Sequence, residues 1–266
     1  MNQNLIDFYN NYNEDGRLDT RYGAIEFLTT MHYIRKYLQP GMRIIEIGAG
    51  TGRYSHALAQ QGWQVDAVEL VQHNIDVFNE HTLPDEPVTV VQGTALDLSM
   101  FGSNTYDITL LLGPMYHLYT KEDQQKALYE AIRVTKKGGI IFAAYCMGDA
   151  SLLLYGFRHG KIHELMEKCA IDPETFDGFS RPWDLFQLYR PEDIESLRSR
   201  FAVTKLHLIA ADGYANHIRD QLAEMDAETY ELFIKYHLAT CERQDLIGYS
   251  NHTLDIFRKE NGRNTQ

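Results

Sequence analysis

Short apolar runs alternate with amphipathic segments through the middle of this 266-residue chain, and this rhythm constrains the fold more than any other feature. Strands are predicted at MRIIEI (42–47), WQVDAVEL (63–70), VTVVQGTAL (88–96), YDITLLLG (106–113) and GIIFAAY (139–145). Nearly continuous apolar strands that alternate with helices are typical of a parallel sheet covered on both faces. We therefore predict an α/β fold with a doubly wound, mostly parallel sheet and helices on both of its faces.

The flanking segments predict additions to this core. Apolar residues recur at helical spacing in 21–38, and a sixth strand at 201–210 and a closing strand at YSNHTLDIFRKE (249–260) follow the core. We expect a single domain over residues 1–266. Its four parts would be an N-terminal helical cover at 1–40, a ligand-binding core at 41–145, an insertion or lid at 146–190, and a C-terminal completion of the sheet with a helical insert at 191–266.

Composition and charge limit the partners. The formal net charge of −12 argues against a nucleic acid, because phosphate contacts need clustered Lys and Arg. No uninterrupted apolar stretch approaches the length that spans a membrane, so we expect no membrane partner. Cys146, Cys169 and Cys241 form no CxxC pair, and the first residues lack the pattern of a secretory signal. We therefore expect reduced thiols and a cytoplasmic location.

The segment RIIEIGAGTGRYS (43–55) brings Gly48, Gly50 and Gly52 together directly after the first predicted strand. In an open α/β sheet, ligands bind outside the carboxyl ends of the strands, where such a turn lies. Glycines there let the backbone approach a ligand closely. An isolated turn of this kind can also form without a ligand, but here it opens a helix and is followed by Glu69 at the end of the second predicted strand.

Two carboxylates near this turn narrow the choice of ligand. Glu69 is suited to accept hydrogen bonds from the two hydroxyls of a ribose. The glycine spacing differs from the dinucleotide pattern GxGxxG, and Glu46 would repel a pyrophosphate but attract an ammonium group. A ligand with ribose hydroxyls and an amino group but no phosphate is S-adenosylmethionine.

The sequence resembles the class I S-adenosylmethionine-dependent methyltransferases over about residues 40 to 145. The similar segments, in family order, are EIGAGTG (46–52), VDAVEL (65–70), VVQGTALDL (90–98), YDITLLLGPMYHL (106–118) and KKGGIIFAAY (136–145). The resemblance implies a Rossmann-like, seven-stranded sheet with an antiparallel last strand. It also implies that S-adenosylmethionine is converted to S-adenosylhomocysteine.

The same resemblance assigns cofactor-binding residues. It places Glu46, Gly48, Ala49, Gly50 and Gly52 around the methionine portion, Glu69 with Leu70 at the ribose, Thr94 and Ala95 at the adenine, and Leu112 at the end of the fourth strand. One departure concerns the adenine. Many members have Asp where Thr94 stands, so a charged contact to the adenine amino group is replaced at best by a weaker one.

The segment GPMYHL (113–118) is where such enzymes place groups that handle the acceptor. It contains neither the Asn/Asp-Pro-Pro-aromatic pattern, nor a Pro-Cys nucleophile, nor an Asp that could hold Mg²⁺. His117 is the best candidate for a catalytic base, because its imidazole titrates near neutrality. The alternative is that His117 caps the next helix or packs against Tyr116.

Further residues could surround an acceptor. Tyr9, Arg21 and Tyr22 of the N-terminal cover could line the pocket, and Trp183, Phe186 and Tyr189 of the insertion could form an apolar wall. Each could equally be a packing residue. His159 and His163 lack a third metal ligand at suitable spacing, so no metal site is predicted.

The cover and the insertion should both overhang the carboxyl edge of the sheet, and a roofed pocket suits a small molecule. We therefore predict a methyltransferase that transfers a methyl group to an O, N or C atom of a small-molecule metabolite by in-line displacement. Two alternatives stay open: a non-catalytic subunit that binds S-adenosylmethionine as a sensor or supports a partner, and, with less support, an NAD-linked oxidoreductase. The sequence does not predict an oligomeric state.

Overall fold

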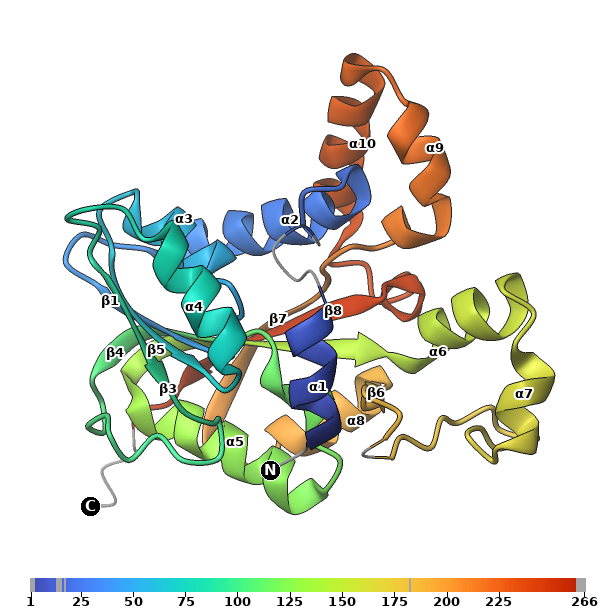
Figure 1. Ribbon diagram of the computed structural model, residues 1–266, viewed down its shortest axis with the longest axis horizontal. Coiled ribbons are helices and arrows are strands. Elements are labelled where there is room, and N and C mark those ends of the chain that lie inside the picture. Colours follow the sequence, from blue (N-terminus) through green and yellow to red (C-terminus); the bar gives the residue numbers. More distant parts are fainter. Residues whose placement is uncertain (1–2, 13–15, 17, 182, 262–266) are drawn as a thin grey trace.

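Seven strands lie side by side in the order β3-β2-β1-β4-β5-β8-β7 in the computed structural model, which describes residues 3–12, 16, 18–181 and 183–261 (Figure 1). The strands are β1 (Arg43–Ile47), β2 (Gln64–Glu69), β3 (Val88–Gln92), β4 (Tyr106–Leu111), β5 (Thr135–Met147), β7 (Val203–Ala210) and β8 (His252–Lys259). β8 is antiparallel to β5 and β7, and the other pairs along this path are parallel. The two-residue β6 (Leu188–Tyr189) adds to β5 off this path. The predicted sheet is confirmed, with one short strand in addition.

The order of strands reverses between β1 and β4, so the sheet is doubly wound. Helices α2 (Arg21–Tyr37), α3 (Arg53–Ala59) and α4 (Gln72–His81) cover one face, and α5 (Lys121–Val134) and α8 (Pro191–Arg198) cover the other (Figure 1). Both faces of β1 and β4 are therefore buried, as their apolar sequences predict. The reversal leaves room for a ligand at the carboxyl ends of these two strands.

The start of helix α5 follows from its local sequence. The side chain of Thr120 accepts a hydrogen bond from the backbone N–H of Asp123 at 3.1 Å, which satisfies one free donor of the first turn. Ala127, Leu128 and Ala131 are buried against the sheet. The cap and the apolar stripe agree on the same boundaries and the same face.

Two predicted boundaries were wrong. The fifth strand was predicted to begin at Gly139, but β5 begins at Thr135 directly after α5 and includes the segment KKGG (136–139). The chain accommodates it through a register shift in the β4–β5 pairing and a positive φ at Gly138. The third strand was expected to reach residue 96 but ends at Gln92. The residues after it form a loop at the carboxyl edge, where the site lies.

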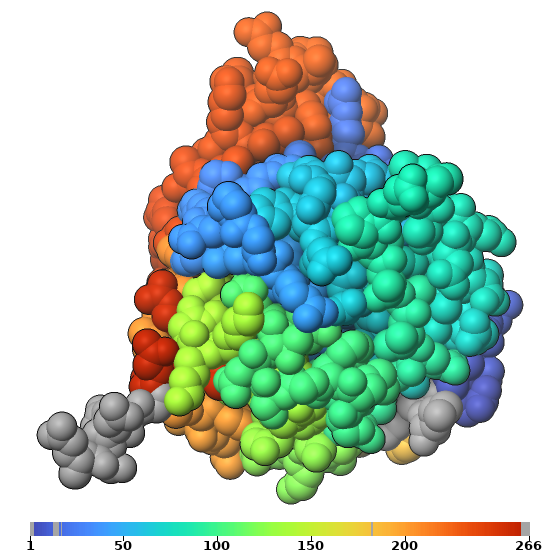
Figure 2. Space-filling view, turned by 90° about the vertical axis from the view of Figure 1, so that its left-hand side faces the viewer, coloured from blue at the N-terminus to red at the C-terminus, as the bar shows by residue number. Residues whose placement is uncertain are grey.

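Several helices surround this core. Helix α1 (Gln3–Asn11) lies near the carboxyl ends of the strands, and the insertion after β5 forms α6 (Gly148–Ser151), the π-helix η2 (Leu152–Arg158) and α7 (Ile162–Glu167) (Figure 1). Helices α9 (Arg219–Glu224) and α10 (Ala227–Thr240) rise above the rest of the surface as a separate protrusion (Figure 2). Within the described residues, none of the helices combines the length and apolar character that crossing a bilayer requires.

Candidate functional site

A cavity of about 550 Å³ opens at the carboxyl ends of β1, β2 and β4. This volume lies within the range of about 300–1,000 Å³ that small-molecule sites occupy. The wall at one end is the glycine turn, residues 48–51, with the loops after β2 and β3. The wall at the other end is formed by α1 and by the segment after β4, which includes the 3₁₀-helix η1 (Pro114–His117). One cavity therefore joins the predicted cofactor residues to the predicted acceptor residues.

The glycine turn has the backbone that the sequence predicts. Gly48 has φ of +75°, and a Cβ on it would lie 2.6 Å from Cδ of Pro114. Gly52 has φ of +90°, and a Cβ there would lie 2.4 Å from the ring of Phe78. Any side chain at either position would be strained and would clash. Gly48 lines the cavity, whereas Gly52 packs below it at the start of α3.

Glu69 ties the glycine turn to the end of β2. Its carboxylate accepts hydrogen bonds from the backbone N–H groups of Gly50 at 2.8 Å and Val71 at 2.9 Å, and from the amide of Asn74 at 3.3 Å. Burial raises the pKa of Glu69, and these hydrogen bonds oppose the shift. Within the described residues, the Oε2 atom accepts a hydrogen bond from Gly50 alone, so it keeps a lone pair for a ligand in the cavity that Glu69 lines.

Glu46 is 2% exposed and lines the cavity from the end of β1. The hydroxyl of Ser55 donates a hydrogen bond to Oε2 of Glu46. Burial raises the pKa of Glu46 to about 8, against the opposing effect of the Ser55 hydrogen bonds. The carboxyl group is therefore protonated at neutral pH until a cation approaches it. The sequence analysis did not identify Ser55 as its partner.

The loop after β3 closes the cavity over β2. The N–H of Gly93 donates to the carbonyl oxygen of Glu69 at 2.9 Å, and the hydroxyl of Thr94 accepts from the N–H of Leu96 at 3.3 Å. The hydroxyl oxygen of Thr94 thus already accepts one hydrogen bond from its own loop. The structure places every predicted cofactor residue except Gly52 on the cavity wall: Glu46, Gly48, Ala49, Gly50, Glu69, Leu70, Thr94, Ala95 and Leu112. Their contacts with a ligand stay predictions.

His117 lies on the cavity wall at the end of η1 with both ring nitrogens hydrogen-bonded. Nδ1 lies 2.9 Å from the carbonyl oxygen of Leu185, so Nδ1 carries the proton and donates. Nε2 then accepts from the hydroxyl of Tyr9 at 2.9 Å. Burial lowers the pKa of His117 to about 4. The imidazole is neutral at physiological pH, and the lone pair on Nε2 is occupied by the hydrogen bond from Tyr9.

Aromatic residues from three segments pack around His117. The ring of Phe186 lies 5.4 Å from it and the ring of Tyr116 lies 4.9 Å from it, measured between centroids. The hydroxyl of Tyr119, which the sequence analysis missed, donates to the carbonyl oxygen of Leu185 at 2.6 Å. α1, η1 and the insertion thus meet above the cavity, where the sequence predicts a roof.

The other candidate acceptor residues lie elsewhere. Arg21 donates to the carbonyl oxygen of Leu222 at 3.1 Å, and Tyr22 packs in the small apolar cluster below α9. Trp183 is 67% exposed, while the buried Tyr189 donates its hydroxyl proton to the carbonyl oxygen of Met115 at 2.8 Å. For Arg21, Tyr22 and Tyr189 the contacts support the packing alternative, whereas the exposed Trp183 neither lines the cavity nor belongs to the buried core. Tyr9 and Phe186 are the members of these two sets that reach the acceptor end of the site.

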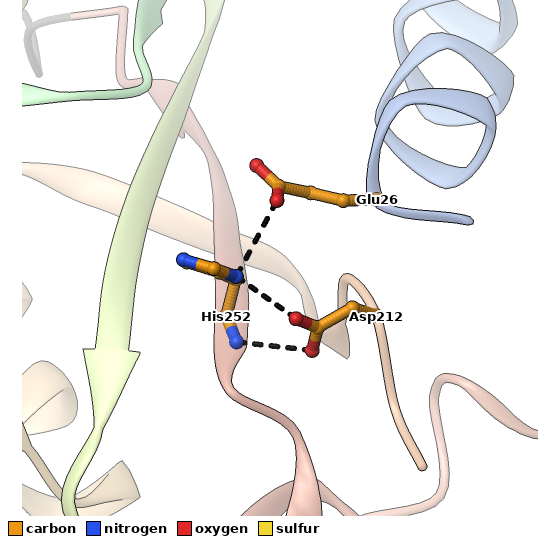
Figure 3. Close-up of side chains that lie close together, drawn as sticks. All are labelled: Glu26, Asp212 and His252. Atoms are coloured by element: carbon orange, nitrogen blue, oxygen red, sulfur yellow. Dashed lines mark hydrogen bonds and ion pairs between the residues drawn. The ribbon is translucent and has the colours of Figure 1, made fainter. Parts of the chain in front are cut away.

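A polar cluster that the sequence analysis missed lies at the same edge of the sheet. Nδ1 of His252 lies 2.8 Å from Oδ2 of Asp212 and 3.4 Å from Oε2 of Glu26 (Figure 3). Asp212 follows β7, His252 begins β8, and Glu26 reaches down from α2 and lines the cavity. Because β8 is antiparallel, its first residue lies where β7 ends. The pairing of β7 with β8 therefore brings Asp212 and His252 together.

Comparison with known proteins identifies the central part of the chain. Residues 45–143 match the family described as "Methyltransferase domain". The demethylmenaquinone methyltransferase of Clavibacter sepedonicus is 34% identical over 119 residues, which are 44% of this chain and 46% of that protein. The cypemycin N-terminal methyltransferase of a Streptomyces species is 31% identical over 103 residues, 38% of this chain and 41% of that one. The chain thus spans less than half the length of these relatives.

The likeness to solved structures extends over nearly the whole chain. A S-adenosylmethionine-dependent methyltransferase of Thermotoga maritima, described as a possible histamine N-methyltransferase, superposes with a TM-score of 0.58 and 18% identity. The superposition covers 95% of this chain and 98% of that one. At this identity the likeness establishes the shared fold, including the segments outside residues 45–143.

Proposed function

We propose that this protein transfers the methyl group of S-adenosylmethionine to a small-molecule acceptor, a proposal that the match of residues 45–143 to the methyltransferase-domain family supports. The cofactor supplies a methyl carbon that is already activated by its sulfonium sulfur. The contribution of the protein is to hold the acceptor in line with that carbon and to exclude water. The acceptor atom, an O, N or C atom, is left open.

The observation that carries this proposal is the continuity of the cavity. The same cavity of about 550 Å³ is lined by Glu46 and Glu69 at one end and by Tyr9, Tyr116 and His117 at the other. A donor and an acceptor bound at these two ends would share one enclosed space. Such an arrangement suits a transfer between two small molecules better than a binding site for the cofactor alone.

The chemistry of the side chains fits S-adenosylmethionine. The carboxyl group of Glu46 is placed to ionise beside the ammonium group of the methionine portion, and Glu69 is placed for the ribose hydroxyls. Leu70, Ala95 and Leu112 provide apolar contacts along the same wall. A pyrophosphate would instead meet Glu46 at the glycine turn, which argues against a nicotinamide cofactor.

The acceptor end supports a small and largely apolar substrate. Its wall is built mainly from apolar and aromatic residues, such as Leu5 and Tyr9 of α1, Leu18 before α2 and Tyr116 after β4. The relative from Clavibacter sepedonicus is named for a quinone-type acceptor, demethylmenaquinone. His117 can serve as a base there only where an acceptor hydroxyl replaces Tyr9 at Nε2.

Two further expectations belong to this proposal. One cluster of buried side chains extends from Met31 of α2 through the sheet to Phe257 of β8, which supports a single domain. All three cysteines are free, which supports a reducing, cytoplasmic setting.

The test uses S-adenosylmethionine labelled on its methyl group. The purified protein and the labelled cofactor are incubated with an extract of the cells that produce the protein, and the products are separated by size. We expect protein-dependent label in the low-mass fraction. Label that stays with macromolecules would overturn the small-molecule proposal. S-adenosylhomocysteine binding without any transfer of label would favour the alternative of a non-catalytic sensor or partner subunit.

A further inference from the structure

His252 is held in one orientation by a buried carboxylate. Oδ2 of Asp212 lies 2.8 Å from its Nδ1, and Oδ1 of Asp212 accepts from the backbone N–H of His252 at 3.0 Å and from the hydroxyl of Ser250 at 2.7 Å. Asp212 is 5% exposed. A carboxylate with this set of partners fixes both the rotation of the imidazole and the tautomer with the proton on Nδ1.

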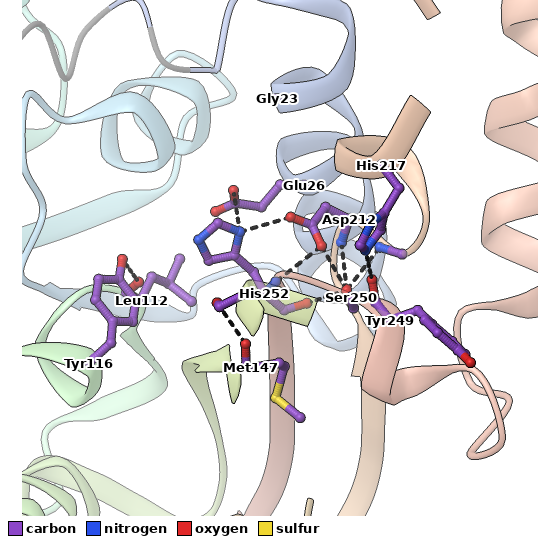
Figure 4. A network of polar contacts seen from close by, with 12 residues as sticks. Gly23, Glu26, Leu112, Tyr116, Met147, Asp212, His217, Tyr249, Ser250 and His252 are labelled. Carbon is purple, nitrogen blue, oxygen red and sulfur yellow. Dashed lines mark hydrogen bonds and ion pairs between the residues drawn. The ribbon is translucent and has the colours of Figure 1, made fainter. Parts of the chain in front are cut away.

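The other ring nitrogen of His252 lies on the side of the ring away from Asp212, next to residues of the cavity wall, although His252 itself is not one of the lining residues. Figure 4 shows Nε2 on the side of the ring that faces Leu112 and Tyr116, two residues of the cavity wall. The ring centroids of Tyr116 and His252 lie 6.3 Å apart, and the side chain of His252 is 23% exposed. Among the residues that the structure describes, none forms a hydrogen bond with Nε2, in contrast to Nε2 of His117.

The hydrogen bonds assign a proton rather than a metal ion to the space between the three side chains. Within the described chain, Glu26, Asp212 and His252 are the one group of metal-ligating residue types that converges, with ligand atoms within 4.8 Å of one another. Both oxygens of Asp212 are already engaged, Oδ1 by Ser250 and by the backbone of His252 and Oδ2 by Nδ1. A cation would have to displace the Nδ1 proton and this bond.

We propose that His252 is the general base of the methyl transfer, with Asp212 as its positioning residue and Glu26 as a second carboxylate that stabilises the imidazolium. This inference rests on the proposed function. The acceptor would carry a hydroxyl or an amine that must lose a proton. The acceptor heteroatom passes that proton to Nε2 and forms a bond to the methyl carbon, while the bond between carbon and sulfur breaks and its electron pair stays on sulfur. The products are the methylated acceptor, S-adenosylhomocysteine and imidazolium.

The surroundings of His252 predict how this base depends on pH. The groups that face the imidazole are Glu26 from α2, Asp212 after β7, the buried thiol of Cys146 from β5, and Tyr116 from η1. Burial alone would lower the pKa of His252, but the facing acidic groups outweigh it and raise the pKa well above its ordinary value. These facing groups therefore favour the imidazolium form of His252. The transfer rate should rise with pH as the base is released.

The first test measures the base without turnover. The protein is labelled with ¹³C-histidine, and the ring signal of His252, assigned with the His252→Gln variant, is followed against pH by NMR. We expect a pKa above 6.5 that falls in Glu26→Gln and in Asp212→Asn, whereas the exposed-site variant His163→Gln leaves it unchanged. A signal that titrates at or below 6.5, or that ignores both carboxylate substitutions, would overturn the proposal.

The second test measures transfer from methyl-labelled S-adenosylmethionine to the low-mass fraction of the extract. His252→Gln should lose about 10²- to 10⁴-fold in rate, the usual contribution of a general base, and should keep its affinity for S-adenosylhomocysteine. In Glu26→Gln the transfer rate should begin to rise at a lower pH than in the wild type, because the substitution lowers the pKa of His252. His163→Gln is the matched control, with an unchanged rate.

Three results would overturn the assignment of His252 as the general base. One is a His252→Gln variant with an unchanged rate. Another is a wild-type rate that EDTA abolishes and Mg²⁺ or Mn²⁺ restores, because a cation would then occupy the place assigned to the proton. A wild-type protein that transfers no label would overturn the proposed function together with this base, and the wild-type arm alone distinguishes that failure from the first result.

Discussion

The hydroxyl of Tyr9 donates a hydrogen bond to Nε2 of His117 across 2.9 Å and so joins α1 to the segment after β4. Leu5 and Tyr9 line the cavity from the same helix. α1 has one fully buried side chain, Leu5, so this bond is a large part of what holds the helix in place. The contacts that hold the cover over the acceptor end include this neutral hydrogen bond, the packing of Leu5 and the aromatic contacts of Phe8 and Tyr9.

Removing that hydroxyl should loosen the cover. In Tyr9→Phe the lost hydrogen bond corresponds to about 0.5–1.5 kcal/mol, so amide hydrogens of residues 3–12 should exchange about 3- to 10-fold faster. Hydrogen exchange followed by mass spectrometry measures this. Tyr129→Phe, at an exposed position of α5, is the control and should change nothing. Unchanged exchange in Tyr9→Phe would show that α1 is held by other contacts.

The low pKa of His117 predicts a loss of stability in acid. Its pKa is about 4 in the folded chain and 6.5 ordinarily, so the unfolded chain binds more protons between these values. Stability should therefore fall as pH drops from 6.5 toward 4, by roughly 1–3 kcal/mol from this residue. In urea unfolding, lowering the pH from 7.5 to 5 should change the free energy of unfolding less unfavourably in His117→Gln than in the wild type, because the opposite effect of Glu46 is the same in both proteins.

The control for this prediction is His163→Gln, because His163 is exposed on α7. The wild-type difference should persist in it. Part of the difference should also persist in His117→Gln, since burial lowers the pKa of His237 as well. An identical pH dependence of wild type and His117→Gln would contradict the neutral, buried state of His117.

Glu46 predicts a conflict between stability and binding. Its pKa of about 8 means that the folded chain binds more protons than the unfolded chain between about pH 4.5 and 8, so stability falls as pH rises through this window. Glu46→Gln removes that loss and should raise the free energy of unfolding at pH 7.5 by roughly 1–3 kcal/mol. The same variant should bind S-adenosylhomocysteine about tenfold more weakly, because an amide offers no charge to the ammonium group.

Both quantities can be measured on the same samples, by urea unfolding and by calorimetric titration. Glu174→Gln, at an exposed position, serves as the control for both. A Glu46→Gln variant that is less stable at pH 7.5, or that binds with unchanged affinity, would show that Glu46 is ionised and structural in the free protein.

A buried ion pair between α8 and β8 predicts a large stability effect away from the site. Arg198 donates to Oδ1 of Asp255 at 2.5 Å, and the two residues are 3% and 0% exposed. Arg198→Leu should cost about 3–5 kcal/mol, because it leaves Asp255 unpaired in the core. The double variant Arg198→Leu/Asp255→Leu should recover most of this in urea unfolding. Arg243→Leu, which breaks an exposed pair with Asp245, should cost less than about 1 kcal/mol.

The strands and the glycine turn could be predicted because local pattern and tertiary role coincide there. Gly48 and Gly52 sit where positive φ and close packing both exclude a side chain, so the sequence signal is unambiguous. The KKGG segment shows the opposite case. Its composition favours a turn, but pairing with β4 draws it into β5, and tertiary pairing outweighs local preference.

The acceptor end could be predicted only in outline. His117 was singled out by its place after the fourth strand, but its bonds to Tyr9 and Leu185 join residues 108 and 68 positions apart in the sequence. No local pattern records such contacts. The closeness of Asp212 and His252 could have been predicted from the sequence, because an antiparallel last strand places its first residue beside the end of β7. Glu26 carries no comparable signal in the sequence.

The most direct test of the account is a calorimetric titration of S-adenosylhomocysteine into the wild-type protein and into Glu69→Ala. We expect the wild-type protein to bind one S-adenosylhomocysteine per chain, and NADH should not displace it. Glu69→Ala should bind S-adenosylhomocysteine at least tenfold more weakly, a difference of about 1.4 kcal/mol in binding free energy. Glu174→Ala should bind like the wild type. Displacement by NADH, or equal affinities of the wild type and Glu69→Ala, would contradict the assignment of this cavity to S-adenosylmethionine.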